Sequence, residues 1–151
     1  MREENSNGFS LIELLIVVAI ILIIAAIAIP SFLRAKISAN ESSAVSSIHA
    51  VNTAEIAYSS MNPTIGFSVT LGDLGPAKGD FIDSNLAAGQ RSGYKFTYSP
   101  VAGGPPNQQY TLNADPILRS VTGQRSFYSD ESNITRYNES AAAGPTDLAI
   151  Q

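Results

Sequence analysis

Residues 8–29 read GFSLIELLIVVAIILIIAAIAI, and the 21 residues from position 9 onward carry a single charged side chain, Glu13. An α-helix rises about 1.5 Å per residue, so this run spans roughly 31 Å, enough to cross a hydrocarbon core of about 30 Å. The run contains 15 Leu, Ile, Val or Phe side chains. Exposing them to water would cost on the order of 20–45 kcal/mol at roughly 1.5–3 kcal/mol each. The run is therefore expected to lie in lipid or against other apolar helices.

Glu13 requires a partner in such surroundings, because a buried, unpaired carboxylate is strongly unfavourable. The nearest candidate cation is the α-amino group that cleavage between Gly8 and Phe9 would create. Glu13 is thus a candidate functional residue rather than a structural one.

The segment resembles the N-terminus of type IV prepilins: a glycine, a phenylalanine, a small polar residue, Leu-Ile-Glu, and an apolar helix that ends in Ala-Ile-Pro at Pro30. The resemblance covers about the first 30 residues closely. It implies that a prepilin peptidase cuts after Gly8 and that the new N-terminus, Phe9, is methylated. It also implies that Glu13 guides assembly by neutralising the positive charge of the N-terminal amino group of a neighbouring subunit.

Three other interpretations of the apolar run remain open. It resembles an ordinary membrane anchor for a periplasmic domain. It also resembles a secretory signal peptide, because residues 26–28 have the small-x-small form of a cleavage site, although the run is long and residues 1–8 are not basic. The third is a buried core helix, although a chain of only 151 residues rarely buries a helix that is hydrophobic on every side.

The remaining length suits one domain of about 120 residues. The formal charge is −4, with nine basic residues spread along the chain, so no basic patch for nucleic acid is evident. The chain has no cysteine, so neither a disulfide nor thiol chemistry is available. Many type IV pilins close their C-terminal region with a disulfide, and this chain departs from that pattern.

Residues 31–60 are expected to continue the helix beyond Pro30, which would normally end or kink it. Apolar residues recur at helical spacing along one face, and the opposite face is mostly polar. Glu41 and Glu55 fall on or near the apolar stripe, which the pattern does not explain. The stripe is Ile37, Ala44, Ile48, Val51 and Tyr58, and the opposite face is Lys36, Asn40, Ser43, Ser47 and Ala50.

The period then changes to two, which is typical of strands. Residues 94–98 and 110–114 alternate between apolar and polar side chains, and residues 124–128 and 134–137 are weaker candidates. Short connections favour an antiparallel sheet covered on one face by the helix. The sequence therefore predicts an α+β fold, a long N-terminal helix, transmembrane and then amphipathic, packed on a small antiparallel β-sheet, as in type IV pilins.

The expected organisation has four parts. Residues 1–8 form a leader peptide, and residues 9–60 form the long helix, of which 9–29 is the transmembrane and filament-core part. Residues 61–138 form the globular head, and residues 139–151 form a loosely held tail.

Other chemistry is weakly indicated. His49 is the only histidine, which excludes a multi-histidine metal site; we expect it on the surface. Asp130 and Glu131 offer oxygen ligands for calcium without EF-hand spacing, so a hairpin turn explains them equally well. Asn40, Asn133 and Asn138 begin matches to the glycosylation pattern, which is short and common. No catalytic constellation emerges, so we expect a structural protein, not an enzyme, without cofactors.

Three functions follow from these observations. The first is a subunit that polymerises through its N-terminal helix into a type IV pilus for motility, adhesion or DNA uptake. The second is a major pseudopilin of a type II secretion system, and the third is a membrane-anchored periplasmic binding protein that does not polymerise.

The resemblance implies four partners: further copies of the chain, a prepilin peptidase, an assembly platform and the inner membrane. It places the subunit in the inner membrane and then in an extracellular filament, or in a periplasmic one if it is a pseudopilin. The charges flanking the apolar run argue for the opposite topology, because Arg34 and Lys36 follow it.

Overall fold

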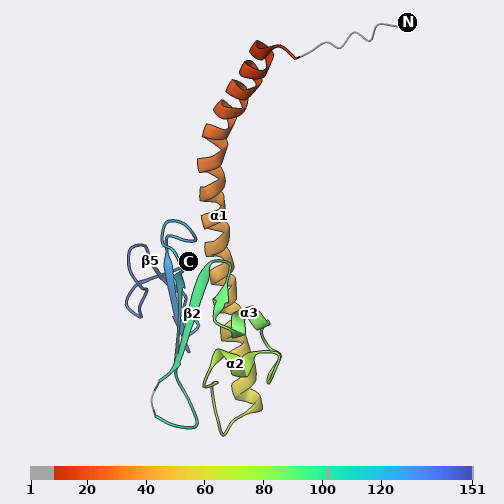
Figure 1. Ribbon diagram of the computed structural model, residues 1–151. Helices are drawn as coiled ribbons and strands as arrows, with labels where there is room; N and C mark the ends of the chain where they lie inside the picture. Colours follow the sequence, from red (N-terminus) through yellow and green to blue (C-terminus); the bar gives the residue numbers. More distant parts are fainter. Residues whose placement is uncertain (1–8, 102, 151) are drawn as a thin grey trace, which may run out of the picture. The chain divides into compact units, whose positions relative to one another are not determined.

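Helix α1, Leu11–Met61, is the longest element of the chain, and Pro30 lies inside it. The computed structural model describes residues 9–101 and 103–150, and the chain divides into two units, Met1–Ala35 and Lys36–Gln151. Gly8 and the expected leader peptide lie outside the described residues. The single helix confirms the expectation that helical structure continues beyond Pro30 (Figure 1).

The part of α1 in the first unit is apolar and exposed. Within it, an 18-residue window has a mean hydropathy of 3.3 and none of its residues is buried. Among the described residues, α1 is the one helix that is long and apolar enough to cross a membrane. A signal sequence near an N-terminus is equally long and apolar. The motif at residues 8–13 is therefore needed to distinguish a retained membrane helix from a signal sequence.

The end of α1 is set by Asn62 and Pro63. The Asn62 N–H and its side-chain amide both donate to the carbonyl of Tyr58, at 2.9 and 3.0 Å. Pro63 follows and has no N–H with which to continue the helix. Two single-turn helices come next, α2 at Leu71–Leu74 and α3 at Ser84–Ala87.

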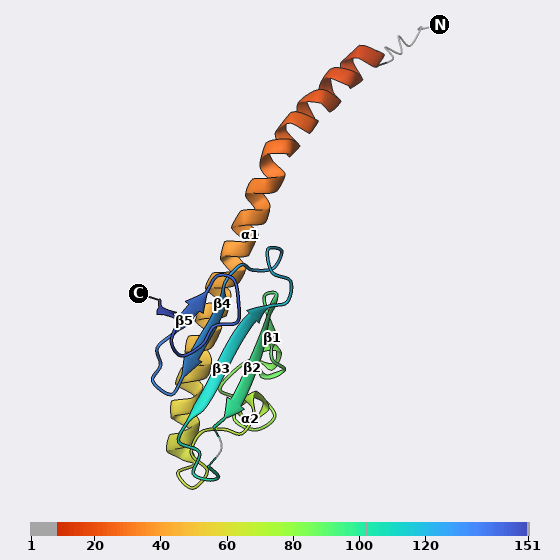
Figure 2. The ribbon, with the colours of Figure 1, turned by 90° about the vertical axis from the view of Figure 1, so that its left-hand side faces the viewer.

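The sheet has six strands in the order β1-β2-β3-β4-β5-β6, with every neighbouring pair antiparallel. Figure 2 shows the central strands side by side along the second-unit part of α1. Strands β2 and β3 pair along their whole length, from Tyr94 opposite Pro116 to Pro100 opposite Tyr110. The strands are β1 Gln90–Arg91, β2 Tyr94–Pro100, β3 Tyr110–Pro116, β4 Ser126–Asp130, β5 Arg136–Asn138 and β6 Leu148–Ala149.

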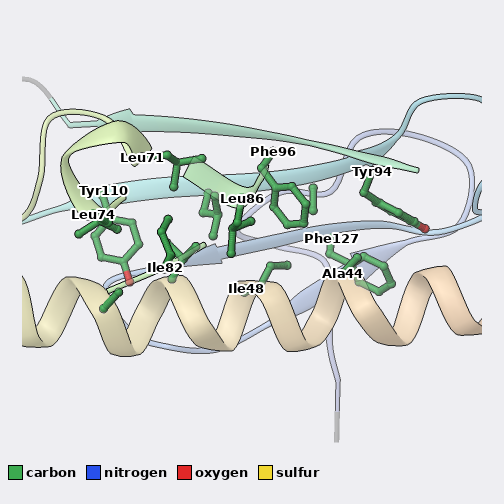
Figure 3. Packing of buried hydrophobic residues seen from close by; sticks show 14 residues of the cluster. Ala44, Ile48, Leu71, Leu74, Ile82, Leu86, Tyr94, Phe96, Tyr110 and Phe127 are labelled. Atoms are coloured by element: carbon green, nitrogen blue, oxygen red, sulfur yellow. The ribbon is translucent and has the colours of Figure 1, made fainter. Parts of the chain in front are cut away.

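The core lies between α1 and the sheet, and α2 and α3 contribute Leu71, Leu74 and Leu86 to it. Figure 3 shows Ala44 and Ile48 of α1 facing Phe127, Tyr94 and Phe96 of the strands. All five side chains are at most 4% exposed. This packing confirms the predicted α+β architecture of a long helix on an antiparallel sheet.

The structure differs from the expectation on the polar face of α1. Ser47, expected on that face, is 1% exposed and satisfies its hydroxyl by donating to the carbonyl of Ser43 at 2.8 Å. Glu41 and Glu55, left unexplained by the pattern, are both buried. The stripe itself is correct at its centre, since Ala44, Ile48 and Val51 are buried.

The C-terminal segment is another difference, because residues 139–150 are held rather than loose. Strand β6 pairs with β5, and the Ile150 N–H donates to the carbonyl of Thr135 at 2.8 Å. Ala143 is 5% exposed, and its carbonyl accepts a hydrogen bond of 2.8 Å from the side-chain amide of Asn113. The expectation of a loose tail relied on its small and polar composition, which does not reveal such long-range contacts.

Candidate functional site: the start of helix α1

The start of α1 is organised by a local contact between Ser10 and Glu13. The carbonyl of Ser10 accepts the first hydrogen bond of the helix, from the N–H of Leu14 at 3.2 Å. Oε2 of Glu13 accepts a hydrogen bond of 2.9 Å from the N–H of Ser10. A glutamate three residues into a helix that reaches back to the cap residue forms one half of a capping box. The acid thus helps to begin the helix on which it lies.

Ser10 was not among the residues predicted to be functional. The signal was present, because serine followed by glutamate three positions later, directly before an apolar run, is the sequence signature of a capping box. The structure therefore adds a local role for Glu13 to the assembly role that the resemblance implies.

The electrostatics of this end favour a negative charge. The first N–H groups of a helix have no partners within it and carry a partial positive charge. An ionised carboxylate has about four acceptor positions, and Ser10 occupies one of them. The carboxylate of Glu13 therefore keeps the capacity to accept from an ammonium group while it caps the helix. Phe9, where such an ammonium would form, lies just before the helix and is 78% exposed.

The surface around this acid is apolar on every side of the helix. Each residue from 9 to 29 is exposed except Ala25, which is half-buried. Leu11 and Ile27 are 80% and 73% exposed. A helix that is hydrophobic all round requires lipid or other helices as its surroundings. The site is therefore one acid at the start of a helix that no other described residue of its unit covers.

Pro30 ends the apolar segment without ending α1. Its ring removes one helical hydrogen bond, and membrane helices accommodate such a loss through neighbouring groups. A kink at Pro30 stays a prediction.

In the second unit, Glu41 fastens α1 to the turn before β4. Its Oε1 accepts from the backbone N–H groups of Gln124 and Arg125 at 2.9 and 3.0 Å, and its Oε2 accepts from Nε of Arg125 at 2.8 Å. Burial alone would raise the pKa of Glu41, but these hydrogen bonds and the Arg125 charge outweigh burial and lower it. The guanidinium of Arg125 also lies over the rings of Phe127 and Tyr137, at 5.5 and 5.4 Å from their centres.

Glu55 is buried on the same helix in a different environment. Its oxygens accept from the N–H and the hydroxyl of Ser68, at 2.9 and 2.5 Å. Burial raises the pKa of Glu55, and the hydrogen bonds from Ser68 only partly offset that effect. No lysine or arginine forms a salt bridge with Glu55 among the described residues. This acid therefore holds the loop before α2 by hydrogen bonds alone.

The remaining candidates do not form a site with several ligands. His49 is exposed on α1, as expected. Oδ1 of Asp130 accepts from the N–H of Ser132 at 3.0 Å, the geometry of a turn. Within residues 9–101 and 103–150, no group of three or more His, Cys, Asp or Glu side chains is placed to hold a metal ion.

The three glycosylation patterns differ in exposure. The side-chain amide of Asn40 donates to the carbonyl of Thr122 at 2.7 Å, and Oδ1 of Asn138 accepts from the N–H groups of Ser140 and Ala141, each at 3.0 Å. Asn133 is exposed and has a positive φ of 61°. Asn133 is thus the most accessible of the three.

Comparisons with known proteins agree on the N-terminal segment. A family model described as the prokaryotic N-terminal methylation motif matches residues 5–29. The type IV major pilin protein PilA of Myxococcus xanthus is 41% identical over 76 residues, which are 46% of this chain and 34% of that protein. The type IV wide pilus major component PilA4 of Thermus thermophilus is 58% identical over 38 residues, which are 25% of this chain and 29% of that protein. The chain thus matches about a third of the length of each relative, and these matches confirm the resemblance to type IV pilins.

Proposed function

We propose that this chain, whose N-terminal segment carries the methylation motif of type IV pilins, is a structural subunit that polymerises through that segment into a pilus. The observation that carries the proposal is the position of Glu13. It is the only charge between residues 9 and 29, and it lies at the start of an exposed helix. An anchor that only holds a domain in the membrane gains nothing from such an acid.

Polymerisation gives the exposed apolar helix and its acid a common explanation. Side chains that lie in lipid in the subunit pool pack against the same segments of other copies in a filament. The carboxylate of Glu13 then pairs with the ammonium group of Phe9 from a neighbouring copy, which removes two unpaired charges from apolar surroundings. The pilus components among the relatives support this assignment.

The proposed partners follow the same route. A prepilin peptidase cuts between Gly8 and Phe9 and methylates Phe9, and an assembly platform in the inner membrane moves subunits into the extracellular filament. Residues 1–8, 9–60, 61–138 and 139–151 would serve as the leader, the long helix, the head and the C-terminal segment of the head.

Processing is tested by mass spectrometry of the mature protein. We expect a chain that begins at methylated Phe9. A chain that begins at Ile29 or Pro30 would instead establish the signal-peptide interpretation.

Assembly is tested by Glu13→Ala. This change leaves the ammonium of a neighbour without its partner, a loss on the order of 3–5 kcal/mol per contact. We expect normal amounts of membrane-bound subunit and few or no filaments in electron micrographs of sheared surface material. Leu14→Ala is the matched control, because it trims the neighbouring side chain and leaves the acid, and it should assemble markedly better than Glu13→Ala.

Glu13→Gln separates the two roles of the acid. Glutamine retains an acceptor for the N–H of Ser10 and so preserves the cap, but it carries no charge. We expect this variant to assemble only slightly better than Glu13→Ala. Assembly at the level of the unaltered chain would show that capping, rather than charge pairing, is the reason for the acid.

A further inference from the structure

The turn between β3 and β4 presents an unusual surface. Ile117, Leu118 and Val121 are 51%, 59% and 60% exposed, three large apolar side chains within five residues. Connecting segments normally carry polar side chains, and exposed apolar groups that cluster mark interaction surfaces. Residues 117–123 are called the apolar turn below.

The apolar turn is held in one conformation by its own hydrogen bonds. The carbonyl of Leu118 accepts from the N–H groups of Val121 and Thr122, at 3.1 and 2.8 Å, and the N–H of Ser120 donates to the carbonyl of Gly123 at 2.8 Å. The Thr122 hydroxyl also accepts from the Leu118 N–H at 3.1 Å. Arg119, the only charged residue of the turn, directs its guanidinium inward to the hydroxyl of Ser126 at 2.8 Å. The exposed apolar groups are therefore fixed outward on a rigid support.

The position of the apolar turn in the second unit indicates what it contacts. The side-chain amide of Asn40 donates to the Thr122 carbonyl at 2.7 Å, and Glu41 binds the backbone N–H groups of the two residues that follow the turn. Asn40 and Glu41 lie in the first turns of α1 after the second unit begins at Lys36, and the apolar turn directly follows the end of β3 at Pro116. In Figure 2 the tip of β3 lies at the end of the second unit where α1 enters it. The turn is thus fastened to the part of the head that is nearest in sequence to the apolar run.

The length of chain between the two is short. Only ten residues separate Ile29, the last of the apolar run, from Asn40. At about 1.5 Å per residue they measure about 15 Å along a helix. The headgroup layer occupies roughly 5–7 Å of that length on each side of the hydrocarbon core. Arg34 and Lys36 lie in this connection, and basic residues beside a membrane span are attracted to anionic headgroups.

From this placement we infer that the apolar turn is a membrane contact of the unassembled subunit: Ile117, Leu118 and Val121 enter the headgroup region of the bilayer in which residues 9–29 are anchored. The inference rests on the anchoring in the proposed function but not on polymerisation. The contact steadies the head on the membrane surface while residues 9–29 are anchored in the bilayer.

The absence of cysteine from the chain allows a direct test. Leu118→Cys and Val121→Cys are each labelled with an environment-sensitive dye in the full chain. The protein is reconstituted at low density into vesicles of phosphatidylethanolamine and phosphatidylglycerol that carry a headgroup spin label as quencher. Val69→Cys is the matched control. Val69 is a similarly exposed apolar residue. It lies beside a later part of α1 than the apolar turn does, because the adjacent Ser68 binds Glu55, which is 15 residues further along α1 than Asn40.

We expect the dye at positions 118 and 121 to be quenched severalfold more strongly than the dye at position 69. Equal quenching at the three positions, or no quenching at 118 and 121, would overturn the inference. If the chain still floats with the vesicles in that case, the anchoring itself stands. Efficient disulfide cross-linking of two unlabelled copies of the Val121→Cys variant in the same vesicles would also overturn it, because the turn would then be a contact between subunits. A chain that does not float with the vesicles would overturn both the anchoring and the inference.

Discussion

Glu41 and Glu55 show how one residue type on one helix acquires opposite behaviour from its surroundings. Both side chains are buried, at 6% and 0% exposed. Glu41 has a guanidinium and two N–H groups as partners, and its pKa is lowered. The Glu55 oxygens accept from the N–H and the hydroxyl of Ser68, no guanidinium or ammonium pairs with them among the described residues, and the pKa of Glu55 is raised by burial. The first acid favours its charged form in the folded state and the second disfavours it.

The Glu41 contact is expected to stabilise the head above the carboxyl range. Because its folded pKa lies below the ordinary value of 4.5, its contribution is complete above that pH and is lost as the pH falls through the folded pKa. Glu41→Gln removes the charge and sets an amide against the Arg125 guanidinium. We expect the free energy of unfolding at pH 7 to fall by about 1–3 kcal/mol, measured by urea denaturation. The difference from the unaltered chain should shrink as the pH drops toward 3.

Glu55→Gln is the matched comparison and should behave in the reverse way. The folded pKa of Glu55 lies above 4.5, so its stability contribution is complete below the unfolded pKa and is lost as the pH rises through the folded pKa. Glutamine removes this loss while it keeps polar atoms beside Ser68. We expect Glu55→Gln to equal or exceed the stability of the unaltered chain at pH 7, with no advantage at pH 4. A large destabilisation at pH 7 would mean that the charge of Glu55 has a partner beyond Ser68.

The secondary-structure elements differ in how well the sequence predicts them. Helix α1 and strands β2 and β3 are long enough for a period to be visible, and all three were predicted. Strands β1 and β6 have two residues each, too few to show an alternation, and pairing with a neighbour alone defines them. The single-turn helices α2 and α3 were not predicted because they are also too short to show a period, and the sequence around them is typical of loops.

The candidate residues at the start of α1 could be named from the sequence because their signal is local. Phe9 and Glu13 were found from a continuous motif, and the contact between Ser10 and Glu13 also spans only three residues. The burial of Glu41 depends on residues 83 and 84 positions away, which no local pattern records. The roles of Gly8, Phe9, Glu13 and Pro30 in processing, assembly and helix bending stay predictions.

The C-terminal segment is joined to the sheet by the side chain of Arg119, in a chain without a disulfide. Its guanidinium donates to the backbone carbonyls of Glu139 and Ala141, at 3.1 and 3.2 Å, and to the carbonyl of Gln124. The planar group with five donors suits this set of acceptors, and a lysine ammonium does not. The hydrogen bonds of Arg119 therefore hold residues 139–141 in a chain that cannot form a disulfide there.

Replacement of Arg119 should loosen that segment selectively. We expect Arg119→Ala to accelerate amide hydrogen exchange at Asp147 and Ile150, whose N–H groups bond Gly144 and Thr135, and to leave exchange in β2 and β3 nearly unchanged. Arg119→Lys should fall closer to the alanine variant than to the unaltered chain. Uniform acceleration across the sheet would contradict a local role.

The two units differ in where their buried side chains lie. The described residues of the first unit, 9–35, contribute nothing to the buried core cluster, whose 14 members run from Ala44 to Phe127. The second unit contains the whole cluster together with its six-stranded sheet. The stability of the head therefore depends on packing within the second unit, and the proposed function assigns the apolar run to the membrane and to other copies.

This division predicts that the head folds without the apolar run. A chain lacking residues 1–28 should be a monomer by analytical ultracentrifugation and should melt in one cooperative transition. A second chain that begins at Lys36 should melt at nearly the same temperature, because residues 29–35 supply no core side chain. Calcium should leave both melting temperatures unchanged, since a ligand that binds only the folded state would raise them by mass action. A markedly lower melting temperature for the shorter chain would show that the helix before Lys36 supports the head, and a calcium-dependent rise would reveal an ion site near Asp130.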